Sequence, residues 1–281
     1  MNNRFRPAKT AAFLYILICF FLLSSCVSHL REAKFYYTQG EKFSRIYKEE
    51  RSLASFKRAL IEAKLEVAKH PSAQAYMLKG MAELNLELLG EAEESFLQAF
   101  SYGFEKGEDW AKQLSLYGLG VSLQETGLED SCLKIYVYLL NRSNFKQVCL
   151  LAAQRYSDIM LKKALPKKGK EREKILADLL KTAEKLTNKD LSCGFYHYIQ
   201  SQVYSHIKDY RKSFEEAVMA KELGLPTEKT LRDNDNQIIF CHRKLKEELS
   251  PKDWEHFNSL YLEWMEKWNW EGPETPTWKK R

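Results

Sequence analysis

Small and hydrophobic residues recur at helical spacing along most of the chain, and four segments repeat one pattern. A small residue is followed 12 positions later by another small residue, then 4 further on by an aromatic or apolar residue, and then 3 further on by another. This pattern predicts pairs of antiparallel helices that approach closely at the small residues, with an aromatic side chain filling the gap to the next pair. The four sets are Gly40, Ser52, Phe56 and Ala59; Gly80, Ala92, Phe96 and Ala99; Gly120, Cys132, Tyr136 and Leu139; and Ser201, Ser213, Ala217 and Ala220.

Strand signals are nearly absent, because the chain has no useful run of alternating Val, Ile or Thr and no Asn-Gly or Asp-Gly hairpin. Together with the repeats, this predicts an all-α fold class. A degraded copy of the repeat is expected in residues 150–161 and 175–186. Residues 161–174 carry seven basic and two acidic side chains. They are predicted to form a loop that either stays solvated or contacts anionic lipid headgroups.

The repeats resemble the tetratricopeptide repeat (TPR) family, and the resemblance covers residues 33–227. It implies that residues 26–227 form a TPR-like helical-hairpin solenoid and that residues 228–270 add C-terminal capping helices. The sequence departs from the family at Glu83, where an aromatic residue is preferred. The recurring small residues are spaced by 40, 40, 33 and 48 positions, whereas the family repeat is about 34 residues long. A helical-hairpin solenoid outside the family is the alternative.

Positions 1 and 5 residues after each small residue would line the concave groove if the helix pairs stack as in TPR proteins. Their mixture of amide, charged and apolar groups suits an extended peptide, whose backbone amides need polar partners. An unoccupied, solvated face is the alternative. The positions are Glu41, Arg45, Met81, Asn85, Val121, Glu125, Gln154, Asp158, Gln202 and His206.

The last predicted helix carries a stripe of aromatic residues. Ser250 and Pro251 are typical of a helix cap and first turn, and the aromatic residues that follow recur at intervals of 3, 4, 3 and 4. Such a helix either covers the end of the repeat core or offers a docking surface to a partner. Residues 271–281 are expected to form a flexible tail. The stripe consists of Trp254, Phe257, Tyr261, Trp264 and Trp268.

The N-terminal segment, residues 1–25, has the three zones of a secretory signal peptide: a basic start, an apolar stretch and small residues before the cleavage point. The apolar stretch from Ala11 to Leu23 holds 13 residues, whereas a membrane-spanning helix needs about 20. The order Leu23, Ser24, Ser25, Cys26 resembles a bacterial lipobox, which implies lipidation of the Cys26 thiol after removal of residues 1–25. An ordinary signal peptide or a signal anchor with a buried cysteine is the alternative.

Lipid on Cys26 would hold the protein at a membrane, since two or three acyl chains anchor stably where one chain is marginal. The resemblance to bacterial lipoproteins further implies the outer membrane, facing the periplasm, because Val27 and not Asp follows the cysteine. Removal of the signal peptide changes the formal net charge from +6 to +3. This charge is too small to indicate a nucleic-acid partner.

Catalytic and metal-binding signals are missing from the sequence. It has no phosphate loop, no His-Glu-x-x-His and no Gly-x-Ser-x-Gly motif, so we expect no enzyme, no catalytic residues and no cofactor. Cys193 and His197 share a helix face, but without a second ligand pair they are expected to pack and not to bind a metal. The remaining cysteines, which an oxidising compartment would allow to pair, are expected to be isolated thiols. They are Cys132, Cys149, Cys193 and Cys241.

These features predict a lipid-anchored scaffold in the periplasm that binds envelope proteins or peptides as an adaptor or assembly factor. The alternative is a ligand-binding or transport-associated TPR lipoprotein that holds a small molecule in a channel between its helices. Met77, Met81 and the Trp-rich C-terminal helix would suit that second function.

Overall fold

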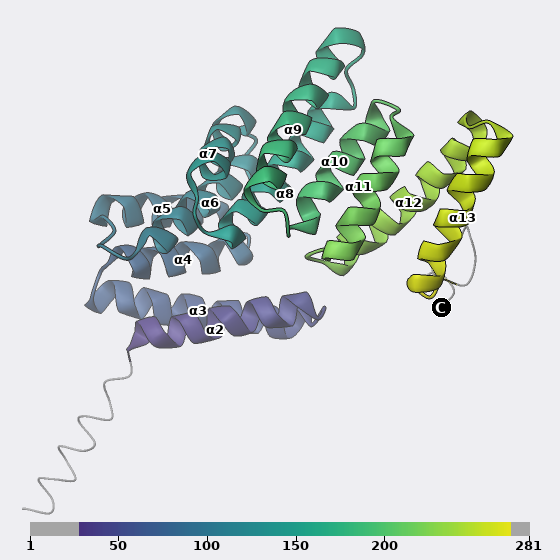
Figure 1. Cartoon of the computed structure of the whole chain (residues 1–281). Helices are drawn as coiled ribbons and strands as arrows, with labels where there is room; N and C mark the ends of the chain where they lie inside the picture. The colour runs from purple at the N-terminus through teal and green to yellow at the C-terminus, as the bar shows by residue number, and fades with distance from the viewer. Residues whose placement is uncertain (1–27, 271–281) are drawn as a thin grey trace, which may run out of the picture. The chain divides into compact units, whose positions relative to one another are not determined.

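A computed structural model of the chain describes residues 28–270, which fold entirely into α-helices and the turns between them (Figure 1). The fold class is therefore all-α, as the sequence predicts. The predicted signal peptide, the Cys26 lipidation site and the predicted tail at residues 271–281 lie outside the described residues. Within the described range, no helix is long and apolar enough to span a bilayer.

The chain divides into two compact units between Leu139 and Leu140. Helices of the first unit are α2 (His29–Arg45), α3 (Glu49–Lys69), α4 (Ala73–Asn85), α5 (Leu89–Tyr102), α6 (Asp109–Glu125) and α7 (Glu129–Arg142), whose last residues pass the division. The second unit holds α8 (Lys146–Ala164), α9 (Gly169–Lys189), α10 (Gly194–His206), α11 (Tyr210–Leu223), α12 (Glu228–Glu248) and α13 (Pro251–Lys267). Helices that follow one another in the chain form hairpins.

Hairpins of the first unit close around aromatic rings, as the repeat pattern predicts. Phe96 of α5 is fully buried between two glycines of neighbouring helices. A Cβ atom on Gly80 of α4 would lie 2.8 Å from the Phe96 ring, and one on Gly118 of α6 would lie 2.2 Å from it. Gly40 meets the ring of Phe56 in the same way. The small residues therefore make room for rings that join one hairpin to the next, which gives the unit its TPR-like packing.

A left-handed residue recurs at the turn inside four hairpins. Tyr47, Glu87, Gly127 and Lys208 have φ values of 56°, 61°, 85° and 66°. Each lies seven positions after the small residue of its repeat and two positions before the next helix. The same turn geometry thus recurs although glycine, which adopts it without steric cost, occupies only one of the four positions.

The basic segment 161–174 is not a loop, contrary to the sequence prediction. Helix α8 continues to Ala164 and α9 begins at Gly169, so only residues 165–168 connect them. Lys, Leu, Arg and Glu all favour helices, and the break is confined to the surroundings of Pro166, which has no N–H to donate. The degraded repeat is nevertheless a helical hairpin, formed by α8 and α9.

The last two helices, α12 and α13, begin at well-formed caps. The hydroxyl of Thr227 accepts a hydrogen bond from the backbone N–H of Thr230 at 3.1 Å, while the Thr230 hydroxyl accepts one from the N–H of Thr227 at 3.3 Å. Ser250 caps α13 by accepting from the N–H of Asp253 at 3.3 Å, and Pro251 occupies the first turn as the sequence predicts.

Candidate functional site

The first helices of successive hairpins lie next to each other in the first unit, so α2, α4 and α6 share one face. Each of these helices packs its small residue against the second helix of its own hairpin. The side chains on the opposite side of α2, α4 and α6 either point outward or contact side chains of the neighbouring first helix. This shared surface, called the first-helix face below, corresponds to the groove that the sequence predicts.

A polar chain crosses the first-helix face near the beginning of its helices. The Lys34 amine on α2 donates a hydrogen bond to the Gln74 amide oxygen on α4 at 3.0 Å, and the Gln74 amide donates in turn to the carboxylate of Glu108 before α6. The same lysine lies 5.3 Å from the centre of the Trp110 ring, within the range of a cation–π interaction. All three helices are therefore linked by side chains that retain unused hydrogen-bonding capacity.

A second polar group lies about one turn further along α2, at Tyr37, and about three turns further along α4, at Asn85. The Tyr37 hydroxyl donates to the Glu41 carboxylate at 3.2 Å and accepts from the Asn85 amide at 3.4 Å. Burial, followed by the negative charge of Glu41, raises the pKa of Tyr37 well above its ordinary value. The phenol therefore stays protonated in the physiological range and serves as a neutral donor on α2 opposite an amide on α4.

The second unit has its own first-helix surface, formed by α8, α10 and α12, since α10 contacts both of the others. Burial and the nearby carboxylates of Asp233 and Asp158 raise the pKa of Tyr198 on α10 to about 12. Loss of hydration also raises the pKa of Asp158, against the opposing effect of Arg155 and Lys229.

The sequence-predicted groove residues divide by accessibility. Arg45, Asn85, Glu125 and Asp158 are exposed, and Glu41, Gln154, Gln202 and His206 are partly buried. Two others are not available to a partner: Met81 and Val121 are only 5% and 4% exposed. Met81 packs in the core of the first unit, in one hydrophobic cluster with Met77 and Phe96, so its side chain is part of the packing and not of an open groove.

Among the partly buried groove residues, His206 has a specific environment. Burial, followed by the positive charge of Arg172, lowers the pKa of His206. The Arg172 guanidinium donates to the His206 backbone carbonyl at 3.4 Å. The imidazole at the end of α10 is therefore more easily kept neutral than an ordinary exposed histidine.

The aromatic stripe of α13 packs largely inward. Tyr261 is fully buried and Phe257 is 9% exposed, whereas Trp254, Trp264 and Trp268 are partly buried. The stripe surrounds Phe214 of α11, whose ring centre lies 4.9 Å from that of Phe257 and 5.6 Å from that of Trp264. Phe257 and Tyr261 are thus core residues, and a docking role is open only to the three tryptophans.

The mostly buried side chain of Lys221 stabilises the end of α13. The Lys221 amine of α11 forms an ion pair with Asp235 of α12 at 2.6 Å. It also lies 5.1 Å from the ring centre of Trp268 and 4.7 Å from that of Trp270. Trp268 in addition donates its indole N–H to Glu222 at 2.7 Å. Trp268 and Trp270 are therefore held in place by contacts within the protein, which gives both side chains a structural role.

Four residues of the first-helix face were not singled out from the sequence: Lys34, Tyr37, Gln74 and Trp110. Lys34 and Tyr37 lie seven and four positions before Glu41, on the same side of α2. A helical projection continued toward the start of each first helix, where the sequence analysis did not look, would have included them. The helical spacing alone was therefore sufficient to place these four residues on the face.

The side chains of Cys193 and His197, which the sequence predicts to pack, have separate surroundings in the structure. The Nδ1 atom of His197 lies 2.6 Å from the Glu216 carboxylate, and burial raises the pKa of the Cys193 thiol. None of the cysteines in residues 28–270 forms a disulfide, and Cys132, Cys149 and Cys241 are buried. Within residues 28–270, no group of three potential ligands could hold a metal ion.

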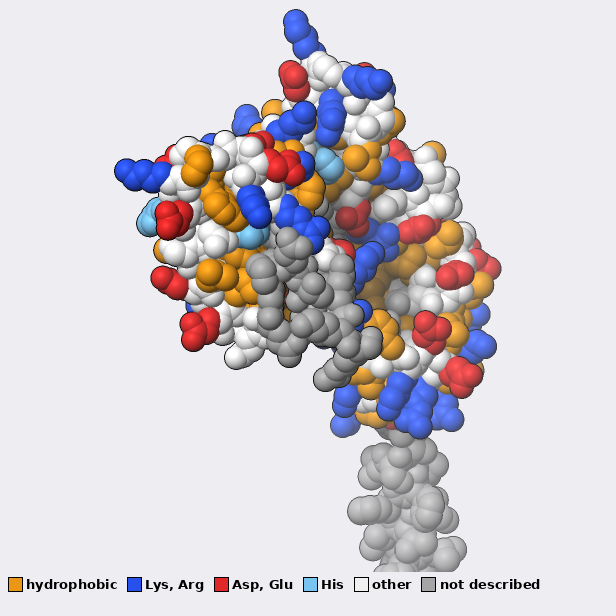
Figure 2. Space-filling view, turned by 90° about the vertical axis from the view of Figure 1, so that its right-hand side faces the viewer, with side chains coloured by type: hydrophobic (Ala, Val, Ile, Leu, Met, Phe, Trp, Pro, Cys, Tyr) orange, Lys and Arg blue, Asp and Glu red, His pale blue; other side chains and the backbone are white. Residues whose placement is uncertain are grey.

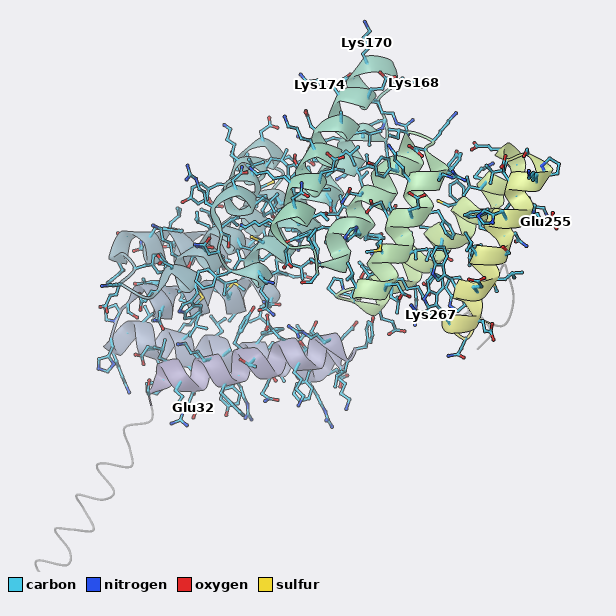
Figure 3. The ribbon with its side chains drawn as sticks, in the orientation of Figure 1. Glu32, Lys168, Lys170, Lys174, Glu255 and Lys267 are labelled. Carbon is cyan, nitrogen blue, oxygen red and sulfur yellow. The ribbon has the colours of Figure 1, made fainter. Side chains whose placement is uncertain are left out.

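Charged side chains are spread over the surface. On the face shown in Figure 2, acidic and basic groups are interspersed with hydrophobic ones. The most prominent basic group is at the tip of the α8–α9 hairpin, where Lys168, Lys170 and Lys174 project (Figure 3). An ion pair between Lys167 and Glu171 at 2.8 Å lies in the same turn. The lysines at this tip are typical of a solvated helix end and do not form a binding site for a ligand.

Comparison with known proteins yields structural neighbours only. No family model matches the sequence, and no curated protein matches it significantly. Similar solved structures include YrrB, a TPR protein with an unusual peptide-binding site, at 19% identity and a TM-score of 0.40, covering 71% of this chain and 90% of YrrB. They also include PilF of Pseudomonas aeruginosa, at 10% identity and a TM-score of 0.48, covering 82% of this chain and 98% of PilF.

Proposed function

We propose that this protein is a scaffold, anchored by lipid on Cys26 and facing the periplasm, that binds an envelope protein or peptide as an adaptor or assembly factor. The observation that carries the proposal is the first-helix face of α2, α4 and α6. Hydrogen bonds through Gln74 and Tyr37 link its three helices, and Trp110 adds an aromatic ring.

An extended peptide is the ligand that this chemistry fits best. Peptide backbones need both donors and acceptors. Gln74 retains one amide N–H to donate, and Asn85, whose two N–H groups go to Tyr37 and Met81, retains its amide oxygen to accept. Lys34 and Glu41 offer opposite charges to partner side chains, while the Trp110 ring offers flat apolar area. None of these groups is arranged as a nucleophile beside a base, so the face supports binding and not catalysis.

The proposed anchor fits the position of the first helix. Helix α2 begins at His29, three positions after Cys26 in the sequence, so lipid on Cys26 would lie close to the start of this helix. A bound partner would therefore be held within reach of the membrane surface. The small-molecule alternative loses part of its support, because Met77 and Met81 are taken up by core packing.

The test is crosslinking of intact cells followed by affinity purification and mass spectrometry. A triple variant, Lys34→Ala, Asn85→Ala and Glu125→Ala, removes polar groups from the first-helix face. The matched control, Glu94→Ala and Lys134→Ala, removes exposed charges from α5 and α7, the second helices of their hairpins. Circular dichroism and thermal unfolding establish that both variants remain folded.

We expect specific envelope proteins that are recovered with the native chain and the control but are reduced about tenfold or more with the face variant, since loss of polar contacts of this kind costs about 1.5 kcal/mol or more in total. Equal recovery with both variants would contradict a role for this face. Metabolic labelling with a fatty acid tests the anchor separately, because Cys26→Ser should abolish incorporation.

A further inference from the structure

An open groove runs along the outer side of the first hairpin, away from α4. Its volume is about 360 Å³. On α2 and α3 this is the side where a preceding repeat would stack, and among the described residues no helix covers it. The lining residues are Phe35, Tyr36, Gln39, Phe43, Arg51, Ala54, Ser55 and Arg58.

The groove combines aromatic rings with guanidinium groups. The Arg58 guanidinium lies 5.5 Å from the ring centre of Tyr36, and that of Arg51 lies 6.0 Å from the ring centre of Phe43. Phe35 is 54% exposed although it is a large apolar side chain. No acidic residue lines the groove. Its chemistry therefore matches a ligand that is apolar in one part and negatively charged in another.

The residues around the groove are also basic and apolar. Ten basic and six acidic residues in the stretch 29–69 give the hairpin a formal charge of +4. Glu32, labelled in Figure 3, shares the groove side of α2 by helical spacing but does not line the groove. Other large apolar side chains of the hairpin are exposed as well: Ile46, Tyr47, Leu53, Ile61 and Leu65.

Two of the six acidic residues are occupied in fixing the start of α2. The Glu62 carboxylate lies 2.7 Å from the Nδ1 atom of His29. The Glu66 carboxylate accepts a hydrogen bond from the backbone N–H of Leu30 at 3.1 Å. Lys69 lies 2.9 Å from the other ring nitrogen of His29. The first turn of α2 is thus tied to the last turns of α3, close to the proposed lipid.

We propose that this groove side docks on the anionic phospholipid headgroups of the membrane that holds the lipid on Cys26. The inference rests on the proposed anchor. Two residue steps of at most about 3.6 Å each separate Cys26 from Ser28, so the hairpin lies at the membrane surface when the cysteine is acylated. Aromatic rings favour the interface and arginines favour lipid phosphates.

Docking would fix the orientation of the protein on the membrane. Helix α2 spans 17 residues, which is about 25 Å at 1.5 Å per residue. With its groove side on the headgroups, the helix lies along the membrane plane and does not stand upright. The first-helix face, on a different side of the same helix, then stays open to the periplasm for a partner.

The experiment measures thiol accessibility on the native lipidated protein in vesicles. Gln39→Cys places a reporter in the groove, and Thr38→Cys places one on the neighbouring exposed position outside it. Both are made in a Cys193→Ser background, because Cys193 is the described native thiol that is not buried. A membrane-impermeant maleimide labels vesicles of phosphatidylcholine alone and of phosphatidylcholine with phosphatidylglycerol.

We expect Gln39→Cys to be labelled more slowly on vesicles that contain phosphatidylglycerol, while Thr38→Cys reacts equally on both. Adding Arg51→Gln and Arg58→Gln should lower the ratio of docked to undocked protein roughly thirtyfold, on the basis of two basic residues at a membrane surface. Labelling of Gln39→Cys on vesicles with phosphatidylglycerol should then approach its own rate on phosphatidylcholine alone, with vesicle flotation unchanged.

The outcomes separate the inference from the proposed function. If the chain does not float with vesicles of either composition, the anchor is wrong and the docking falls with it. If it floats but Gln39→Cys reacts equally fast on vesicles with and without phosphatidylglycerol, docking alone is overturned. Protection of Gln39→Cys in detergent that increases with protein concentration would show a second copy in the groove and would also overturn the inference.

Discussion

The hairpins of the two units close by different means although they share one sequence pattern. In the α4–α5 hairpin, the residue 16 positions after the small residue is Phe96, whose ring fills the space beside Gly80 and Gly118. The equivalent residue of the α10–α11 hairpin is Ala217. There, Asn234 of α12 reaches the Ala217 carbonyl with its side-chain amide at 2.8 Å.

The bulk missing at Ala217 is supplied one helical turn earlier, at Phe214, and by the next hairpin. Phe214 is 1% exposed and meets the rings of Phe257, Tyr261 and Trp264 from α13. The first unit therefore carries its joining rings inside each hairpin, whereas the C-terminal hairpins obtain them from the last helix. The same repeat pattern tolerates both solutions because each fills the volume between hairpins.

The largest effect is expected from Phe96→Ala in the first unit. Its two flanking glycines have no side chains that could fill the space, so the free energy of unfolding should fall by about 3–5 kcal/mol. Chemical denaturation followed by circular dichroism measures the change. As a control, Leu97→Ala removes a neighbouring apolar side chain that is 52% exposed, and a comparable loss there would refute the special role of the ring.

Removal of one partner from the buried ion pair of the second unit should have the next largest effect. Lys221→Met removes the cation that lies 2.6 Å from Asp235, whose side chain is 3% exposed, and should cost about 3 kcal/mol. The double variant Lys221→Met and Asp235→Leu should recover most of that loss, since apolar replacements of buried pairs are often neutral. Failure of the double variant to recover stability would point to the tryptophan contacts of Lys221 instead.

The smallest effect concerns the left-handed turn that both units share. Glu87→Gly in the first unit and Lys208→Gly in the second should each stabilise by up to about 1 kcal/mol, because a non-glycine residue is strained at positive φ. Gly127→Ala should destabilise by a similar amount. Melting temperatures measure all three, and a uniform loss of stability would show that the turn residues matter through contacts and not through φ.

The repeat pattern was sufficient to predict the hairpins because its small and large residues must fit together where two helices meet. Gly80 and Phe96 are related by a contact that any helix pair of this kind must make, so their spacing predicts the structure directly. The segment 161–174 was wrongly predicted as a loop because its charge was given more weight than its helix propensity. Composition identifies the basic character of this segment, but propensity determines its conformation.

The binding face was predicted only in outline, for a reason of geometry. Helical spacing identifies the side on which Met81 and Asn85 lie, but burial depends on the distance to the neighbouring first helices. Met81 is enclosed while Asn85, one turn further, is exposed. Helical spacing could place Tyr37 and Gln74 on this face, but their partners come from segments more than 30 positions away in the chain, so no local pattern could show which side chains meet.

The measurement that tests the scaffold function most directly is site-specific photocrosslinking in living cells. A benzoylphenylalanine at Asn85 lies on the first-helix face, and one at Glu94 on α5 serves as the control. The proposed scaffold function predicts a discrete crosslinked envelope protein or peptide at Asn85 that is missing at Glu94. Identical crosslinking patterns at the two positions, or none at Asn85 in a folded and membrane-bound protein, would contradict it.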